Sequence, residues 1–256
     1  MDIVWNTDDR GYPQANLKLF IPSVSRILSE TIEDTELEAW IKEVGEEKAQ
    51  EIMQNAAHRG TSLHKYMEVF IKDFALSKNK ESSYAFAHKQ SYNELLKENI
   101  PIGKINKGLE LFNIFYYSYN IEQFRDIIST EFKIYSPIHF YRGALDILYK
   151  YNNLRLTDYK TSSKKIEKDT IKEYKYKCQL GAYSNAIDEL LLLKGSNKNV
   201  EYASLLIFLT NDSNLQEIIL EGKELKYYKE EFKTLAIKWH INNNQEFLIK
   251  NKYKND

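Results

Sequence analysis

The sequence predicts a mixed α/β (α+β) fold, in which a central mixed β-sheet is flanked by helices and preceded by a helical N-terminal region. Apolar residues first recur at three- and four-residue spacing, which is the period of an amphipathic helix. From about residue 120 the pattern changes to short segments that are rich in β-branched and aromatic residues and partly alternate. A long helical pattern, two further strands and a final helix follow.

The helical region contains four predicted helices. They cover residues 32–57, 61–75, 84–98 and 104–119. Thr61 follows Gly60 and directly precedes an apolar run, so it is a reasonable N-cap. Pro101 and Gly103 separate the last two helices.

The strands begin as a meander. Its three segments are predicted at 128–136, 142–151 and 154–162. Asn152 and Asn153 suit a turn between the last two segments. Downstream we expect a helix over 171–193, strands over 202–210 and 216–221, and a helix from Lys223. We predict a single domain over 1–256, with a mainly helical part (1–120), a core (121–222) and a C-terminal helix (223–256).

The composition indicates a soluble globular protein. Of 256 residues, 43% are hydrophobic and 29% charged, and no stretch concentrates the nine glycines and four prolines into a linker. Cys178 is the single cysteine, which rules out an internal disulfide and any metal site that needs several thiolates. The N-terminus lacks an apolar signal sequence, and no segment approaches the ~20 apolar residues of a membrane span. We therefore expect a cytoplasmic protein with no membrane partner.

The net charge of −1 provides no overall attraction to nucleic acid, so a polyanion would have to bind a local patch. One such patch extends from Lys160 to Lys177 and holds seven lysines against three acids. This pattern is typical both of a solvated helix face and of a phosphate-binding surface.

The segment RLTDYKTSSK places a carboxylate and an ammonium group side by side. Asp158 and Lys160 are two residues apart on a predicted strand, so their side chains share one face of the sheet. An odd-membered connection between the strands would place Asp146 opposite Asp158 on that same face. A two-residue Asn152–Asn153 turn would put Asp146 on the other face, and a bulge would then be needed to form a site. The sequence leaves both registers open.

Two adjacent carboxylates repel each other, and a divalent cation removes that cost while it polarises a substrate oxygen and lowers the pKa of bound water. Carboxylate oxygens suit Mg²⁺. Lys160 would then help to position the attacking water and offset negative charge at phosphorus. The alternative is a solvent-exposed cross-strand salt bridge.

Four motifs follow one another along the chain. They are RGTSLH (59–64), GALD (143–146), DYKT (158–161) and QLGAY (179–183). In this order, and with PSVSRIL at 22–28, they resemble the PD-(D/E)XK nuclease superfamily over about residues 22–210. The resemblance is to its RecB-like branch, which includes mitochondrial genome maintenance exonucleases, phage exonucleases and CRISPR adaptation nucleases. It implies a restriction-endonuclease-like core.

The resemblance implies a metal site for Mg²⁺ or Mn²⁺. His64, presented from the start of its helix, Asp146, Asp158 and the main-chain carbonyl of Tyr159 would be the ligands, and Lys160 the catalytic lysine. On the residues alone, His64 also suits a surface or capping position. Glu131 could add a carboxylate from the neighbouring strand or pair with a lysine across strands.

The resemblance also implies that Gln179 and Tyr183 support the active site and contact DNA. They are four residues apart and can point together from their helix toward the sheet, where they would otherwise only pack. Short polar or cationic side chains near predicted helix starts are candidates for DNA backbone contacts, and otherwise ordinary caps. These are Ser23, Ser25, Arg59 and Thr61. Lys164 and Lys165 would line a nucleic-acid channel.

The expected function is that of a metal-dependent exonuclease acting on single-stranded DNA in replication, recombination or repair, from a phage or bacterium. A helicase, polymerase or recombination protein is the kind of partner expected. The alternatives are a structure-specific endonuclease on the same fold and a non-catalytic DNA-binding subunit. Only one cysteine is present, which excludes the subgroup with a four-cysteine iron–sulfur cluster, and no P-loop motif occurs.

Overall fold

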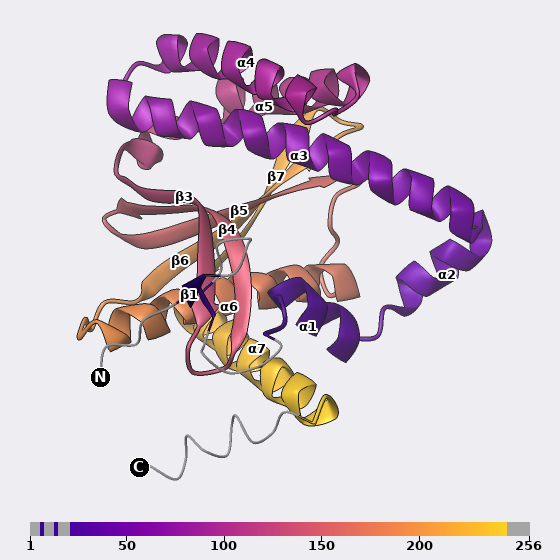
Figure 1. The fold of residues 1–256 in the computed structure, drawn as a ribbon, viewed down its shortest axis with the longest axis vertical. Helices are drawn as coiled ribbons and strands as arrows, with labels where there is room; N and C mark the ends of the chain where they lie inside the picture. The colour runs from indigo at the N-terminus through magenta and orange to yellow at the C-terminus, as the bar shows by residue number, and fades with distance from the viewer. Residues whose placement is uncertain (1–5, 8–12, 15–20, 245–256) are drawn as a thin grey trace.

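The structure is a computed structural model that describes residues 6–7, 13–14 and 21–244. Within these residues a mixed five-stranded sheet lies between two layers of helices (Figure 1). Its strands, in spatial order, are β3 (Ile127–Ser136), β4 (Tyr141–Tyr151), β5 (Asn153–Ser162), β6 (Val200–Leu209) and β7 (Asn214–Glu221). β5 and β6 are parallel and the other neighbours antiparallel. The predicted fold class is therefore confirmed.

The helices on one face are α3 (Glu46–Ser77), α4 (Lys80–Lys97) and α5 (Ile102–Ser118), followed by the short 3₁₀ helix η1 (Ile121–Arg125). On the other face lie α1 (Val24–Thr31), α6 (Ile171–Leu193) and α7 (Gly222–Asn242) (Figure 1). α2 (Thr35–Val44) connects α1 to α3, and β1 (Asn6–Thr7) pairs with β2 (Pro13–Gln14). α6 is the crossover that parallel pairing of β5 and β6 requires.

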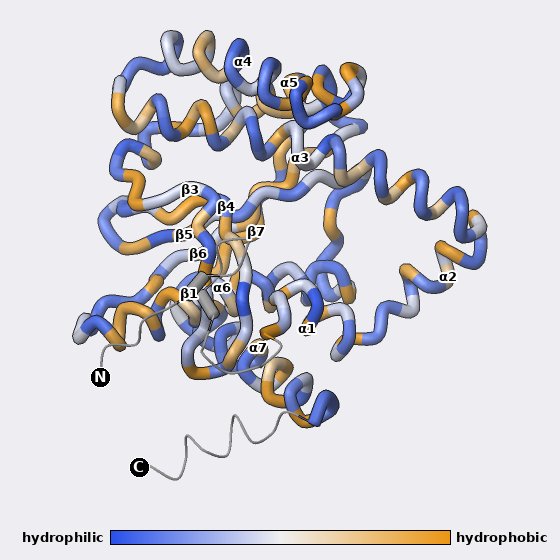
Figure 2. Tube along the Cα trace, in the orientation of Figure 1, coloured by the Kyte–Doolittle hydropathy of each residue, from blue (hydrophilic) through white to orange (hydrophobic). Residues whose placement is uncertain are grey.

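Each face of the sheet has its own apolar core. The core under α3–α5 is rich in aromatic residues and includes Tyr66, Phe70 and Phe112, all fully buried. The core under α1, α6 and α7 includes Leu180 and Trp239. Figure 2 shows hydrophobic segments along the strands between the two helical layers. Because both faces are covered, buried side chains point alternately into one core and the other.

α3 corrects two predictions about the helical region. It runs without interruption through Gly60 and Thr61, so Thr61 is not an N-cap. A glycine inside a helix costs about 1 kcal/mol, but the next turns bury Leu63, Tyr66 and further residues, which outweighs that cost. The break falls at Gly45, whose φ of 85° favours glycine, and it divides the predicted helix 32–57 into α2 and α3.

The hairpin between β4 and β5 has the odd-membered register. Tyr151 pairs with Asn153, and the ladder continues to Ile147 opposite Thr157. Asn152 alone forms the turn, with a φ of 65° that asparagine tolerates better than most residues. The alternative two-residue turn is therefore wrong. Asp146 and Asp158 lie just beyond the last paired residues of the two strands, across from each other.

The other predicted elements agree with the structure to within a few residues, and the helix over 171–193 is reproduced. Residues 245–256 of the predicted C-terminal helix lie outside the described residues. Among the described helices, none combines the length and apolar character that a membrane span requires.

Candidate active site

The site forms where β4 and β5 separate. Their ladder ends at Ile147 and Thr157, so Asp146 and Asp158 occupy the first step beyond it. The Tyr159 N–H, which has no strand partner on that side, donates to Asp146 Oδ2 instead. Asp146 and Asp158 are 6% and 2% exposed, so both carboxyl groups are withdrawn from water.

Both β4 and β3 are irregular at this step. Leu145 and Leu148 pack in the core under α6, whereas Ile147 packs in the core under α3. Regular alternation would put residues 145 and 147 on the same face, so the side-chain direction changes at Asp146. On β3, Glu131 has a φ of 48°, which is unusual and strained for a glutamate.

This irregularity turns Glu131 toward Asp146. The pairs Thr130–Ile147 and Phe132–Leu145 place Glu131 opposite Asp146. From the sequence, Glu131 could be either a metal ligand or the cross-strand partner of a lysine. In the structure its carboxylate lies by His64, at 3.8 Å from Nδ1.

His64 enters from α3, on the other side of the gap. Its Nδ1 is 2.8 Å from Asp146 Oδ1, and its Nε2 is 3.2 Å from the Tyr159 carbonyl oxygen. It lies in the middle of α3 and not at a helix start as predicted. Behind it α3 packs closely on α5 at Gly108, where an added Cβ would be 2.4 Å from Ser62 Cβ. No sequence motif indicated the role of Gly108.

Lys160, Gln179 and Tyr183 lie on the α6 side. Tyr159 points into the core under α3, so Asp158 and Lys160 point toward α6, where the Lys160 ammonium donates to Asp158. Gln179 Nε2 donates to Tyr183 Oη at 2.7 Å. An added Cβ on Gly143 would lie 2.6 Å from Tyr183 Cε1. The glycine of GALD and the tyrosine of QLGAY therefore pack against each other, and the tyrosine ring fits only because the glycine has no side chain.

The site is short of positive charge. Burial raises the pKa of Asp158 to about 7, and the Asp146 carboxylate adds to this effect while Lys160 opposes it. Burial would lower the pKa of His64, but Asp146 and, less strongly, Glu131 raise it to about 10. Burial would raise the pKa of Asp146, but His64 and Lys160 keep it below its ordinary value. The two buried carboxylates compete for the same few cationic groups.

The donor set fits a divalent cation. His64, Glu131 and Asp146 each offer one ligand atom, and these atoms lie within 4.8 Å of one another. The Tyr159 carbonyl oxygen, bonded to His64, is a further hard oxygen donor at the same place. Asp158 is outside that group of three, and its carboxylate is bonded to Lys160. Oxygen-rich sites with one imidazole suit Mg²⁺ or Mn²⁺.

A cavity of about 600 Å³ opens beside His64, and Gly60, Thr61, Lys65 and Glu131 are among its lining residues. Thr61 is thus close to the site although it caps no helix. Ser23 behaves as an ordinary cap, since its Oγ accepts from the Arg26 N–H at 3.1 Å.

Ser25 is exposed, with its Oγ 3.0 Å from Ser23 Oγ. Lys164 and Lys165 are exposed in the loop after β5. The side-chain amide of Gln216 binds both backbone groups of Ile166 at 2.8 Å, which holds this loop against β7.

Arg59 is an unusual residue of α3. It precedes Leu63, Tyr66 and Phe70 by four, seven and eleven residues, so it extends the face of the helix that is buried on the sheet. Its Nε is buried and has no hydrogen-bond partner among the described residues. Desolvation lowers the pKa of its guanidinium group. A buried polar group without a partner calls for an explanation.

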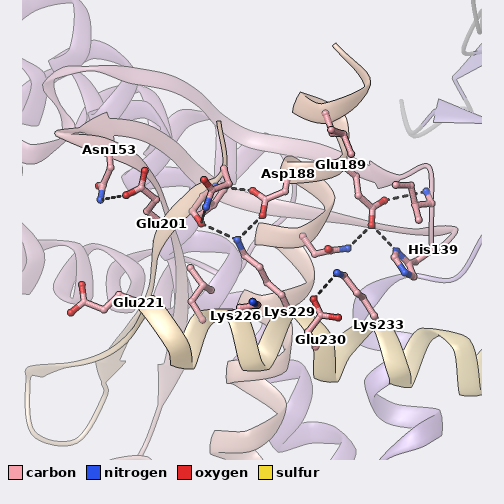
Figure 3. Close-up of a pocket in the computed structure, with 17 residues that line it drawn as sticks. His139, Asn153, Asp188, Glu189, Glu201, Glu221, Lys226, Lys229, Glu230 and Lys233 are labelled. Atoms are coloured by element: carbon pink, nitrogen blue, oxygen red, sulfur yellow. Dashed lines mark hydrogen bonds and ion pairs between the residues drawn. The ribbon is translucent and has the colours of Figure 1, made fainter. Parts of the chain in front are cut away.

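A larger cavity, of about 1040 Å³, lies elsewhere, between the C-terminal half of α6, the start of α7 and the beginning of β6. Figure 3 shows its charged side chains bonded to one another, with Asp188 to Lys229 and Glu189 to His139. No predicted site residue lines it.

One comparison with known proteins agrees with the motifs. A family model described as "PD-(D/E)XK nuclease superfamily" matches residues 29–252. No curated protein sequence matches the chain. One similar solved structure, from Eubacterium rectale and described as a "Putative exonuclease", has 10% identity and a TM-score of 0.44, covering 65% of this chain and 67% of that one. Another, SSO0001, has 14% identity and a TM-score of 0.27, covering 72% of this chain and 86% of that one.

Proposed function

The chain belongs to the PD-(D/E)XK nuclease superfamily, and from this we propose that it is a metal-dependent exonuclease that hydrolyses phosphodiester bonds in single-stranded DNA. The observation that carries the proposal is the convergence of the His64, Glu131 and Asp146 ligand atoms within 4.8 Å, beside the bonded pair of Asp158 and Lys160. A role in replication, recombination or repair fits this activity.

We assign the metal ligands to His64, Asp146, Asp158, the Tyr159 carbonyl and Glu131, with Mg²⁺ or Mn²⁺ as the ion. A bound ion would lower the pKa of water and polarise a phosphoryl oxygen. Binding would also remove the repulsion between the buried carboxylates and release the proton that His64 holds without it.

Lys160 would contact the scissile phosphate. Its ammonium lies beside Asp158 on the α6 side of the gap, where it can orient the attacking water and stabilise charge as phosphorus becomes crowded. Gln179 and Tyr183, bonded to each other, would hold the same end of the substrate.

We propose that the strand's backbone phosphates contact the short polar and cationic groups around the site. These are Ser23, Ser25, Arg59, Thr61, Tyr183, Lys164 and Lys165. Arg59 is the best supported, because its buried Nε has no hydrogen-bond partner within the described part of the chain and a phosphate would offer its guanidinium group paired hydrogen bonds. Charged grooves of this kind bind single strands with little sequence preference.

Residues 1–256 would act as one nuclease domain in the cytoplasm, and a helicase, polymerase or recombination protein would be its partner. A structure-specific endonuclease on the same fold and a non-catalytic DNA-binding subunit are the rival functions.

The test is degradation of 5′-labelled, 3′-labelled and circular single-stranded DNA with Mg²⁺ or Mn²⁺. We expect metal-dependent shortening of the linear strands, intact circles and no activity in Lys160→Ala. Lys177→Ala is the matched control, because Lys177 is already paired with Glu173 at 3.1 Å and Glu224 at 3.0 Å. Cut circles would support the endonuclease instead. Binding without cleavage under any condition would support the non-catalytic subunit.

A further inference from the structure

A line of side chains on α6 runs beside the catalytic strand and extends past the predicted site. Lys172, Tyr176, Gln179 and Tyr183 are spaced by four, three and four residues, so they share one face of the helix. On β5, Asp158, Lys160 and Ser162 alternate and share the face that points toward α6.

Contacts at both ends of the α6 line place it along the sheet. Tyr183 packs against Gly143, three residues before Asp146 on β4. At the other end, Lys172 Nζ is 3.4 Å from Ser162 Oγ. Ser162 is 6% exposed, and its carbonyl oxygen accepts from the Thr210 N–H at 2.8 Å, so its backbone is fixed. Lys172 therefore reaches over β5 two residues beyond Lys160.

Lys172 differs from the other lysines of this helix. Lys175 Nζ is 2.8 Å from Asp34 Oδ2, and Lys177 pairs with two glutamates. No carboxylate lies within ion-pair distance of Lys172 among residues 21–244. Its ammonium group lies 6.0 Å from the centre of the Tyr176 ring. Desolvation lowers the pKa of Lys172, and the negative charge of Asp34 raises it by a smaller amount.

We propose that Lys172, together with the Ser162 hydroxyl, binds the backbone phosphate next to the one that Lys160 contacts. This inference rests on the proposed nuclease function. Two residues of a strand rise about 6.6 Å, so Lys160 and Ser162 offer separate positions for consecutive phosphates. A lysine ammonium acts on a phosphate as a point charge, and a serine hydroxyl donates a hydrogen bond to it. The substrate that this site favours is therefore a polynucleotide and not an isolated phosphodiester.

The experiment compares Lys172→Ala with Lys175→Ala, its ion-paired neighbour on α6. On a single-stranded oligonucleotide we expect Lys172→Ala to raise KM about tenfold with kcat changed less than about twofold. The slope of log KM against log salt should fall by about 0.7, since one phosphate contact is lost. On bis(p-nitrophenyl) phosphate, which has no neighbouring phosphate, Lys172→Ala should match the wild-type protein. Lys175→Ala should match it on both substrates.

A second arm changes the substrate. Two oligonucleotides each carry one neutral methylphosphonate linkage next to the scissile phosphate, one on its 5′ side and one on its 3′ side. For one of the two, the KM of the wild-type protein should rise to that of Lys172→Ala, and for the other it should not. Thermal unfolding checks that each variant is folded, and Lys172→Gln replaces the alanine variant if that variant is not.

Equal KM values and salt slopes for Lys172→Ala and Lys175→Ala would overturn the inference while leaving the nuclease function intact. Equal losses on the oligonucleotide and on the small phosphodiester would also overturn it, because the defect would then lie in catalysis. No cleavage of any substrate by the wild-type protein would overturn the proposed function and this inference with it.

Discussion

Two clusters of charged side chains, each partly or fully buried, lie in different parts of the molecule, and they differ in their balance of carboxylates and cationic groups. One is the gap between β4 and β5, with His64, Asp146 and Asp158. The other, which we call the α6–α7 cluster, consists of Asp188, Glu189, His139 and Lys229 and lines the larger cavity (Figure 3).

In the α6–α7 cluster two carboxylates are matched by two basic side chains, and each carboxylate is hydrogen-bonded. Glu189 accepts hydrogen bonds from Ser136 Oγ, the Ile138 N–H, His139 Nδ1 and Asn185 Nδ2, at 2.5–3.1 Å. Lys229 Nζ is 2.6 Å from Asp188 Oδ2 and 2.9 Å from the Val200 carbonyl oxygen. Such a network fixes the packing of α6 on α7 and leaves no group in need of a ligand.

In the gap, three carboxylates converge on two cationic side chains, and burial raises the pKa of Asp158 to about 7. Buried acids occur in both clusters, and the larger cavity lies beside the α6–α7 cluster and not beside the proposed metal site. The distinguishing feature is a shortage of positive charge that an ion could supply.

The largest difference between the two clusters should be in catalysis. Asp158→Asn removes a carboxylate from the gap, and we expect kcat for DNA cleavage to fall about 1,000-fold, because several kcal/mol of charge stabilisation are lost. The matched change in the α6–α7 cluster, Asp188→Asn, should leave kcat of the folded protein within about twofold. Rates normalised to the folded fraction test this, and similar losses in both variants would remove the distinction.

For stability we expect the opposite result, with the larger effect from a substitution in the α6–α7 cluster. Lys229→Met leaves the half-buried Asp188 without its cation and should lower the free energy of unfolding by about 2 kcal/mol near neutral pH. Desolvation already raises the pKa of Asp188 while Lys229 lowers it, so losing Lys229 raises it further. The folded state then favours the protonated carboxyl, and stability falls as the pH rises above the unfolded pKa of about 3.9. Urea unfolding at pH 4.5 and 7.5 should show the larger loss at pH 7.5, and a loss independent of pH would contradict this account.

A divalent metal ion should stabilise the folded protein only by binding in the gap between β4 and β5. Mg²⁺ or Mn²⁺ at about 100 times its Kd should raise the free energy of unfolding by about 2.7 kcal/mol. Asp146→Asn should abolish this gain, and Lys229→Met should retain it in full. Chemical denaturation with and without EDTA measures the effect, and an equal gain in Asp146→Asn would place the ion elsewhere.

The smallest effect should come from Arg59. Arg59→Met removes a buried Nε that has no partner among the described residues, and should raise the free energy of unfolding by about 1 kcal/mol while weakening single-stranded DNA binding. Lys48→Met is the control, because Lys48 lies on the exposed part of α3 and pairs with Glu51. A destabilised Arg59→Met protein with unchanged DNA affinity would mean that the side chain is needed only for packing.

The sequence was sufficient where structure depends on neighbouring residues. The helix Ile171–Leu193 follows from its apolar spacing, and strands β3–β5 follow from their composition. The same local reasoning failed at Gly60 and Thr61. Their residue types suit a helix boundary, but burial of the face that carries Leu63 and Tyr66 keeps the helix continuous.

The motifs by themselves bring certain side chains together, because the spacing within each motif fixes a shared helix or strand face. Asp158 and Lys160 had to be neighbours, and so did Gln179 and Tyr183, since each pair is set by local periodicity. The odd-membered register that aligns Asp146 with Asp158 was one of two that the sequence allowed.

Only the tertiary structure decided how these pieces meet. His64 on α3 meets Asp146 on β4, Glu131 turns inward at a strained residue of β3, and Lys172 reaches over Ser162. Each of these contacts joins residues on different helices or strands. The distance between them depends on how those elements pack together, which no local sequence pattern predicts. The sequence by itself thus determined the chemistry available to this protein, and packing decided which carboxylates are left without enough positive charge.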